Sequence, residues 1–132
     1  MDKAWTILIV EDDESVQISL EAHFEDKGFA VMLAESAEDA IAMLETESPD
    51  AAIVDLRLPG MGGEALIRKI HAIFPKTVCV VYTGSVEFDL PPDMKETNVI
   101  SPTVFFKPVD DLNMISNEVT RLLNIVNRDS DT

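Results

Sequence analysis

Acidic side chains follow two short apolar stretches of this sequence, at the point where each stretch ends. Glu11 and Asp12 come directly after the first stretch, and Asp55 comes directly after the apolar stretch Ala51–Val54. Carboxylates that end neighbouring parallel strands converge at one edge of a sheet, where an open α/β fold places its ligand site. Such a cluster repels itself and binds hard cations through its oxygen atoms. The spacing therefore predicts a Mg²⁺ site built around Asp55.

Two further polar side chains are expected at the same edge. Thr83 and Lys107 follow the apolar stretches Val78–Tyr82 and Val104–Phe106. With Asp55 as the nucleophile, Thr83 and Lys107 would meet the oxygens of a phosphoryl group. A phosphoryl group in transfer spreads negative charge over its oxygens, and a metal ion and an ammonium group neutralise that charge. Because a carboxylate among other carboxylates attacks an anion poorly, this chemistry requires Mg²⁺ or a similar ion.

The elements that must position these residues alternate along the chain. Short apolar runs predict five strands, which are Thr6–Val10, Phe29–Leu33, Ala51–Val54, Val78–Tyr82 and Val104–Phe106. The runs are nearly continuous, as expected for strands that are covered on both faces. The segments between them carry apolar residues at helical spacing and end at signals such as Gly28, Pro49 and Pro75. This alternation predicts an α/β fold with a doubly wound parallel sheet.

One unit of the alternation is irregular. The stretch Ser85–Thr103 should hold the fourth helix, but Pro91, Pro92 and Pro102 interrupt it, and its apolar residues show no clear period. We expect a shortened fourth helix at most, over about 92–97.

The composition bounds the class of protein and its partners. The chain has 132 residues, of which 46% are hydrophobic, and its 25 acidic and 10 basic side chains give a formal charge of −15. We expect a single domain over residues 1–132, with its core at about 6–124 and a frayed polar tail over 127–132. The negative charge argues against direct nucleic-acid binding and against docking on anionic membranes. A cytoplasmic location is expected, because no run is long enough to span a bilayer and no signal-peptide pattern is present.

Four segments together resemble a known family. They are residues 7–13 (ILIVEDD), 53–63 (IVDLRLPGMGG), 81–84 (VYTG) and 106–108 (FKP). In this order and at these intervals they resemble the receiver domain of two-component response regulators, which a histidine kinase phosphorylates on aspartate. The resemblance runs from Ile7 to about Leu123. It implies a flavodoxin-like, five-stranded parallel sheet of order 2-1-3-4-5, with a histidine kinase or a phosphotransfer protein as the phosphoryl donor.

The resemblance implies a role for each acidic residue of the site. Asp55 matches the phosphorylated aspartate, and Asp12 and Glu11 match the direct metal ligand and its partner. The backbone carbonyl of Arg57 is expected to supply another Mg²⁺ ligand. Asp13 lies just past the pair and is either a further ligand or, as we favour, a solvated residue at the start of a helix, where a negative charge suits the helix dipole.

The resemblance extends to the residues that would meet the phosphoryl group. Thr83 matches the hydroxyl of the conformational switch, and Lys107 matches the phosphate-binding lysine. Gly84 matches a small residue that keeps the phosphoryl approach open. The family often has a cis peptide bond after this lysine, which Pro108 permits.

The sequence departs from the family pattern at one switch position. Receivers usually carry Tyr or Phe three residues before the lysine, whereas this chain has Val104 there, with Phe105 and Phe106 next. Strand alternation puts Phe105 and Val104 on opposite faces, so that Phe105 cannot simply replace the missing aromatic. We therefore expect intact acceptor chemistry and a response expressed mainly by Ser85–Thr103.

Two other functions would use part of the same pattern. A Mg²⁺-dependent phosphohydrolase of the haloacid dehalogenase type also forms an aspartyl phosphate, but it needs a second aspartate where this chain has Arg57. A phosphorylation-independent binding module would fit the altered switch region, but would normally have lost some of the site residues. We expect a switch that is not an enzyme in its own right, acting on a protein target or an output domain that the sequence does not name.

Overall fold

Five parallel strands form the centre of the computed structural model, which describes residues 4–85 and 88–130. The strands are β1 (Thr6–Val10), β2 (Ala30–Ala34), β3 (Ala51–Val54), β4 (Val78–Thr83) and β5 (Ile100–Phe106). Their order across the sheet is β2-β1-β3-β4-β5, and every neighbouring pair is parallel. The predicted doubly wound sheet and its strand order are therefore confirmed.

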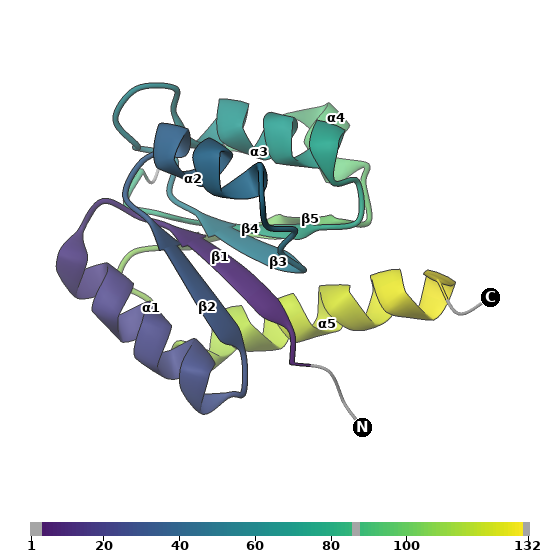
Figure 1. The fold of residues 1–132 in the computed structure, drawn as a ribbon, viewed down its shortest axis with the longest axis horizontal. Coiled ribbons are helices and arrows are strands. Elements are labelled where there is room, and N and C mark those ends of the chain that lie inside the picture. The colour runs from purple at the N-terminus through teal and green to yellow at the C-terminus, as the bar shows by residue number, and fades with distance from the viewer. Residues whose placement is uncertain (1–3, 86–87, 131–132) are drawn as a thin grey trace.

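Helices cover both faces of this sheet (Figure 1). In the described part of the chain they are α1 (Glu14–Asp26), α2 (Ala37–Leu44), α3 (Gly63–Ile73), α4 (Pro92–Lys95) and α5 (Asn113–Ser130). Helices α1 and α5 lie on one face, and α2, α3 and α4 lie on the other. Of the helices in these described residues, none is both long enough and apolar enough to cross a membrane.

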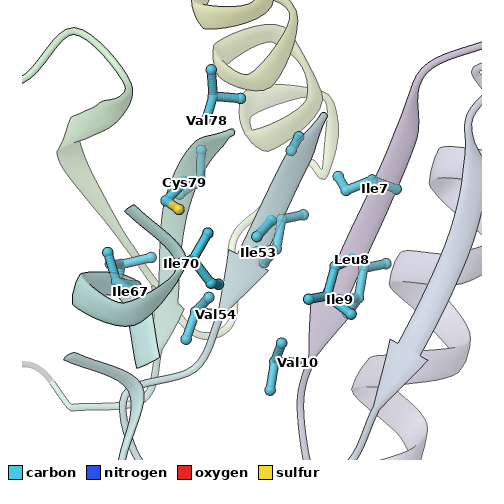
Figure 2. Packing of buried hydrophobic residues seen from close by; sticks show 14 of the residues in the cluster. Ile7, Leu8, Ile9, Val10, Ile53, Val54, Ile67, Ile70, Val78 and Cys79 are labelled. Atoms are coloured by element: carbon cyan, nitrogen blue, oxygen red, sulfur yellow. The ribbon is translucent and has the colours of Figure 1, made fainter. Parts of the chain in front are cut away.

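The hydrophobic core is centred on the three inner strands. Every residue of β3 and β4 is buried, and so is β1 from Ile7 to Val10. Figure 2 shows Ile9 and Ile53, which are partners in the register of β1 and β3, together with Ile67 and Ile70 of α3. Each fully buried side chain of this size contributes about 1.5–3 kcal/mol to folding. The inner strands therefore form a rigid platform for the residues at their carboxyl ends.

The edge strands differ from the expectation of full burial. In β2 only Ala34 is buried, because the strand lies at one edge of the sheet with no strand beyond it. The last strand, β5, begins at Ile100 rather than at Val104. The strand extends past Pro102, which the sequence marks as a break, because an edge strand tolerates a proline. The register with β4 shifts between Ile100 and Val104, as in a β-bulge.

One expectation about helices is confirmed, and another needs correction. The fourth helix is short, as expected, and spans Pro92–Lys95, within the predicted 92–97. The hydroxyl oxygen of Thr97 instead accepts hydrogen bonds from the backbone at Val99 and Ile100, which leads the chain into β5. Residues 127–130, which we expected to be frayed, continue α5 to Ser130. The final two residues of that predicted tail, and residues 86–87 of the irregular unit, lie outside the described part.

Candidate functional site

Three carboxylates meet at the carboxyl ends of β1 and β3. One oxygen from each of Glu11, Asp12 and Asp55 lies within 4.8 Å of the other two. The parallel pairing of the strands causes this, because Val10 and Val54 are register partners and the backbone N–H of Asp55 donates to the carbonyl of Val10. Glu11 and Asp55 are 2% and 5% exposed, whereas Asp12 is open to solvent. The structure thus brings together the carboxylates that the sequence singled out.

The side chain of Lys107 reaches this cluster from the end of β5. Its ammonium group donates hydrogen bonds to the carboxylates of Glu11 and Asp55, with 3.0 Å between Nζ and Oδ2 of Asp55. The backbone N–H of Lys107 donates to the carbonyl of Thr83 over 2.8 Å, which ties the segment to the end of β4. The Lys107–Pro108 peptide bond is cis, as the resemblance allows. One cation thus lies between two buried anions.

Burial and pairing act in opposite directions on the charges of this cluster. Burial raises the pKa of the Glu11 carboxyl group, more than the hydrogen bond from Lys107 lowers it. The charge of Asp55 raises the pKa of Glu11 as well, but by less than burial does. For Lys107, burial lowers the pKa, yet the hydrogen bonds with Glu11 and Asp55 and the charges of these two residues together outweigh burial, so the pKa is raised. A dication in the cluster would stabilise the ionised form of Glu11.

The turn between β1 and α1 fixes the position of Glu11, and its residue Asp13 caps the start of α1. The backbone N–H of Asp13 donates to Oε2 of Glu11 over 3.0 Å, and the buried side chain of Gln17 donates to the Glu11 carbonyl. Oδ1 of Asp13 accepts hydrogen bonds from the backbone N–H groups of Ser15 and Val16. The hydrogen bond from the Ser15 hydroxyl group is the main cause that lowers the pKa of Asp13. Asp13 is therefore the N-cap of α1, in agreement with the reading that we favoured.

The turn between β3 and α3 shapes the surroundings of Asp55. The backbone N–H of Arg57 donates to Oδ1 of Asp55 over 3.1 Å. A β-carbon at Gly63 would lie 2.3 Å from the carbonyl oxygen of Asp55, so this position accepts only glycine without a shift of the backbone. Gly62 has a φ of 85°, a conformation that glycine adopts readily. The glycines therefore serve the turn into α3, and the Arg57 carbonyl remains a predicted ligand.

Thr83 and Gly84 lie at the end of β4, where the carbonyl of Thr83 accepts from the backbone N–H of Lys107. Thr83 is fully buried, and its hydroxyl oxygen accepts a hydrogen bond from the backbone N–H of Ser85 over 3.1 Å. Gly84 is exposed, and a β-carbon added there would meet nothing within 4 Å. Local packing therefore does not require glycine at this position. A small residue there leaves the space beside Thr83 free.

Two aromatic residues near the site were not identified from the sequence as site residues. Tyr82 is 6% exposed, the Nζ atom of Lys107 lies 5.7 Å from its ring centroid, and its hydroxyl oxygen accepts from the backbone N–H of Val109 over 3.4 Å. Phe106 is the register partner of Thr83 and is 37% exposed. In the sequence, both look like ordinary members of apolar strands.

The register also bears on the missing switch aromatic. Val104 pairs with Val81, and Phe106 pairs with Thr83, so alternate positions put Val104 and Phe106 on one face of the sheet. Phe105 pairs with Tyr82 on the opposite face and is buried. Phe105 therefore does not replace the missing aromatic, as expected. Phe106 is an aromatic residue on the same face as Val104, and it lies two residues closer to Lys107 along the strand.

Comparisons with known proteins agree with this geometry. The family model described as the response regulator receiver domain matches residues 7–117. Sporulation initiation phosphotransferase F of Bacillus subtilis is 29% identical over 104 residues, which cover 79% of this chain and 82% of that protein. The protein-glutamate methylesterase/protein-glutamine glutaminase 2 of Paramagnetospirillum magneticum is 38% identical over 111 residues, which cover 83% of this chain but only 32% of that longer protein.

A solved structure agrees in fold over nearly the whole chain. The CheY-like receiver domain protein of Methanospirillum hungatei superposes with a TM-score of 0.83 and 25% sequence identity, covering 96% of this chain and 99% of that one. The match to the family model spans both strands that carry the carboxylates and the strand that carries Lys107. This chain belongs to the response regulator receiver domain family of two-component signalling.

Proposed function

We propose that this receiver domain accepts a phosphoryl group on Asp55, from a histidine kinase or a phosphotransfer protein, and thereby changes its affinity for a protein target. The observation that carries the proposal is the meeting of three carboxylates from two strands with one ammonium group from a third. Membership of the receiver family supports it, and so does the kind of protein named by the relative in Bacillus subtilis, a phosphotransferase.

The donor set of the cluster fits Mg²⁺. Carboxylate oxygens are the ligands that this ion prefers, and Asp12 is open to solvent, which leaves room for the water molecules that Mg²⁺ retains. Asp12, Glu11 and Asp55 would hold the ion, together with the carbonyl of Arg57. When bound, Mg²⁺ reduces the repulsion between the carboxylates and the incoming phosphoryl group.

The side chains present divide the remaining work. An oxygen of Asp55 forms the bond to phosphorus while the bond from phosphorus to the donor nitrogen breaks, and the nitrogen keeps the electron pair. The N–H of Arg57 and the ammonium group of Lys107 orient the Asp55 carboxylate, each through one of its oxygens. Lys107 then neutralises charge on the transferred group, because its ammonium lies within hydrogen-bonding distance of the nucleophile.

The phosphohydrolase alternative has weaker support. It requires an acid two residues after Asp55, where the exposed Arg57 stands. The alternative of a phosphorylation-independent binding module gives no reason for retaining Glu11, Asp12 and Lys107 in contact with Asp55 or close to it. A phosphoacceptor uses all of these groups.

The test is a mass measurement after incubation with acetyl phosphate and Mg²⁺. The wild type should gain one phosphoryl group, and Asp55→Asn should gain none, because an amide cannot form the acyl phosphate. Asp13→Asn is the matched control, since it makes the same change nearby and asparagine serves equally well as an N-cap. This control should be labelled like the wild type. Undiminished label on Asp55→Asn would refute the proposal.

Removal of Lys107 separates the acceptor from the response. Lys107→Ala should fold and should still be labelled on Asp55, more slowly than the wild type, because the nucleophile remains while a neutralising charge is lost. The NMR spectra of Lys107→Ala with and without phosphorylation should differ much less than the corresponding spectra of the wild type.

A further inference from the structure

We propose that Tyr82 is a positioning residue for phosphoryl transfer, which holds Lys107 over its ring and holds the chain after Lys107 with its hydroxyl group. This inference rests on the proposed function, because Tyr82 would act through Lys107. Two contacts support it. Nζ of Lys107 lies 5.7 Å from the ring centroid, and the backbone N–H of Val109 donates to the hydroxyl oxygen over 3.4 Å. Tyr82 thus contacts the segment on both sides of Pro108.

The place of Tyr82 in the sheet explains this arrangement. Side chains alternate along a strand, so Tyr82 and its neighbour Thr83 point to opposite faces of the sheet. On its own face Tyr82 lines a cavity of about 310 Å³, together with Val16 of α1 and with Pro108 and Val109 of the segment before α5. Tyr82 is 6% exposed, so its ring is packed inside the protein beside Lys107.

The ring offers Lys107 a contact that the carboxylates cannot offer throughout the reaction. The other two partners of the ammonium group are Glu11 and Asp55, which are also the groups that would hold Mg²⁺. Once these oxygens are engaged elsewhere, their hold on Lys107 weakens. The face of an aromatic ring attracts a cation within about 6 Å and has no competing role at the site. Tyr82 therefore keeps the ammonium group at the position where the phosphoryl oxygens arrive.

Two variants separate the ring from the hydroxyl group. Tyr82→Phe keeps the ring and removes the hydroxyl, whereas Tyr82→Leu removes both and keeps an apolar side chain in the core. With acetyl phosphate and Mg²⁺, we expect Tyr82→Phe to be labelled up to about twofold more slowly than the wild type, because only the contact with Val109 is lost. Tyr82→Leu should be labelled about three- to tenfold more slowly, because the ring is lost as well. Thermal unfolding of each variant shows whether it is folded before its rate is compared.

A second measurement needs neither metal nor phosphorylation. In the metal-free protein, the ring current of Tyr82 should shift the NMR signals of the Lys107 ε-methylene protons upfield. Tyr82→Phe should keep this shift and Tyr82→Leu should abolish it. If the wild type fails to be labelled, the proposed function is wrong, but this shift still decides whether Tyr82 holds Lys107.

A double-mutant comparison excludes a merely structural role. If Tyr82 acts through Lys107, Tyr82→Leu should change the labelling rate of Lys107→Ala by less than about twofold, because the group it positions is already gone. A general structural defect would slow both backgrounds equally. Equal slowing in the two backgrounds, or Tyr82→Leu labelled at the wild-type rate with unchanged Lys107 signals, would overturn the inference.

Discussion

The ammonium group of Lys107 stands between two carboxylates that would otherwise repel each other. Glu11 and Asp55 are both buried, and removal of a charge from water is costly unless a partner compensates for it. Burial has the larger effect on Glu11, whose pKa is raised despite the contact with Lys107. At the scale of residues, Lys107 therefore does not fully compensate the negative charge of the buried carboxylates. A bound dication would supply the missing positive charge.

This balance predicts that Mg²⁺ stabilises the fold through Asp12. A ligand that binds only the native state stabilises it by about 2.7 kcal/mol at 100 times its dissociation constant. Millimolar Mg²⁺ should raise the thermal midpoint of the wild type, and Asp12→Ala should respond much less, because one oxygen ligand is missing. Calorimetry with and without Mg²⁺ measures this difference, with Asp13→Asn as a control that should respond like the wild type. An equal response from Asp12→Ala would remove Asp12 from the metal site.

At the scale of elements, β5 and α5 are joined by a part-buried polar contact at the bulge. The hydroxyl group of Ser101, which is fully buried, donates to Glu118 of α5, and Arg121 donates to both oxygens of the same carboxylate. Ser101 also accepts from the backbone N–H of Thr103 over 3.1 Å. The contact holds the irregular start of β5 against the final helix.

This contact predicts a pH dependence of stability. The hydrogen bond from Arg121 is the main cause that lowers the pKa of Glu118, and Ser101 adds to it. A carboxyl group with a lowered native pKa stabilises the fold above its unfolded pKa, which is 4.5, and this stabilisation is lost as the pH falls through the native pKa. At pH 7, Glu118→Gln should lower the free energy of unfolding by about 1 kcal/mol, since solvent partly screens Arg121.

Urea unfolding of the wild type and Glu118→Gln between pH 7 and pH 3 checks this expectation. The difference between the two proteins should shrink as the pH falls below 4.5. A difference that stays constant over this range would mean that the charge of Glu118 does not matter.

The segment between β4 and β5 is the element expected to report phosphorylation. Phosphorylation adds about 1.5 to 2 negative charges beside Thr83, whose hydroxyl group now accepts from Ser85. The short α4 is joined to α3 by an exposed ion pair between Arg68 and Asp93, which opposes its movement only weakly. We predict that hydrogen exchange changes most over residues 85–103, and that the ring signals of Phe106 shift, when beryllofluoride and Mg²⁺ are added.

The control for this prediction is Asp55→Asn, which should show no such change. Changes centred on Val104 and α5, with residues 85–103 unaltered, would show that the response does not run through this segment.

At the scale of the whole molecule, the parallel sheet determines where the site lies. The carboxyl ends of β1, β3, β4 and β5 lie at the same end of the sheet, so the residues that follow these strands must lie at that end. The positions of Glu11, Asp12, Asp55 and Lys107 could therefore be predicted without knowing how any side chain packs. The strand order followed from the resemblance to receiver domains, and the shortened α4 followed from Pro91, Pro92 and Pro102.

Other features depended on contacts between elements that leave no trace in local sequence. Three such contacts join residues on different elements or turns. They are the ring contact between Tyr82 and Lys107, the hydrogen bond from Gln17 to Glu11 and the hydrogen bond from Ser101 to Glu118. Local periodicity identifies the face of an element but does not specify the partner that this face meets. The sequence alone determined which groups gather at the sheet edge, because strand ends are local. Only the tertiary structure decided how those groups are held, because that depends on which side chains meet across helices, strands and turns.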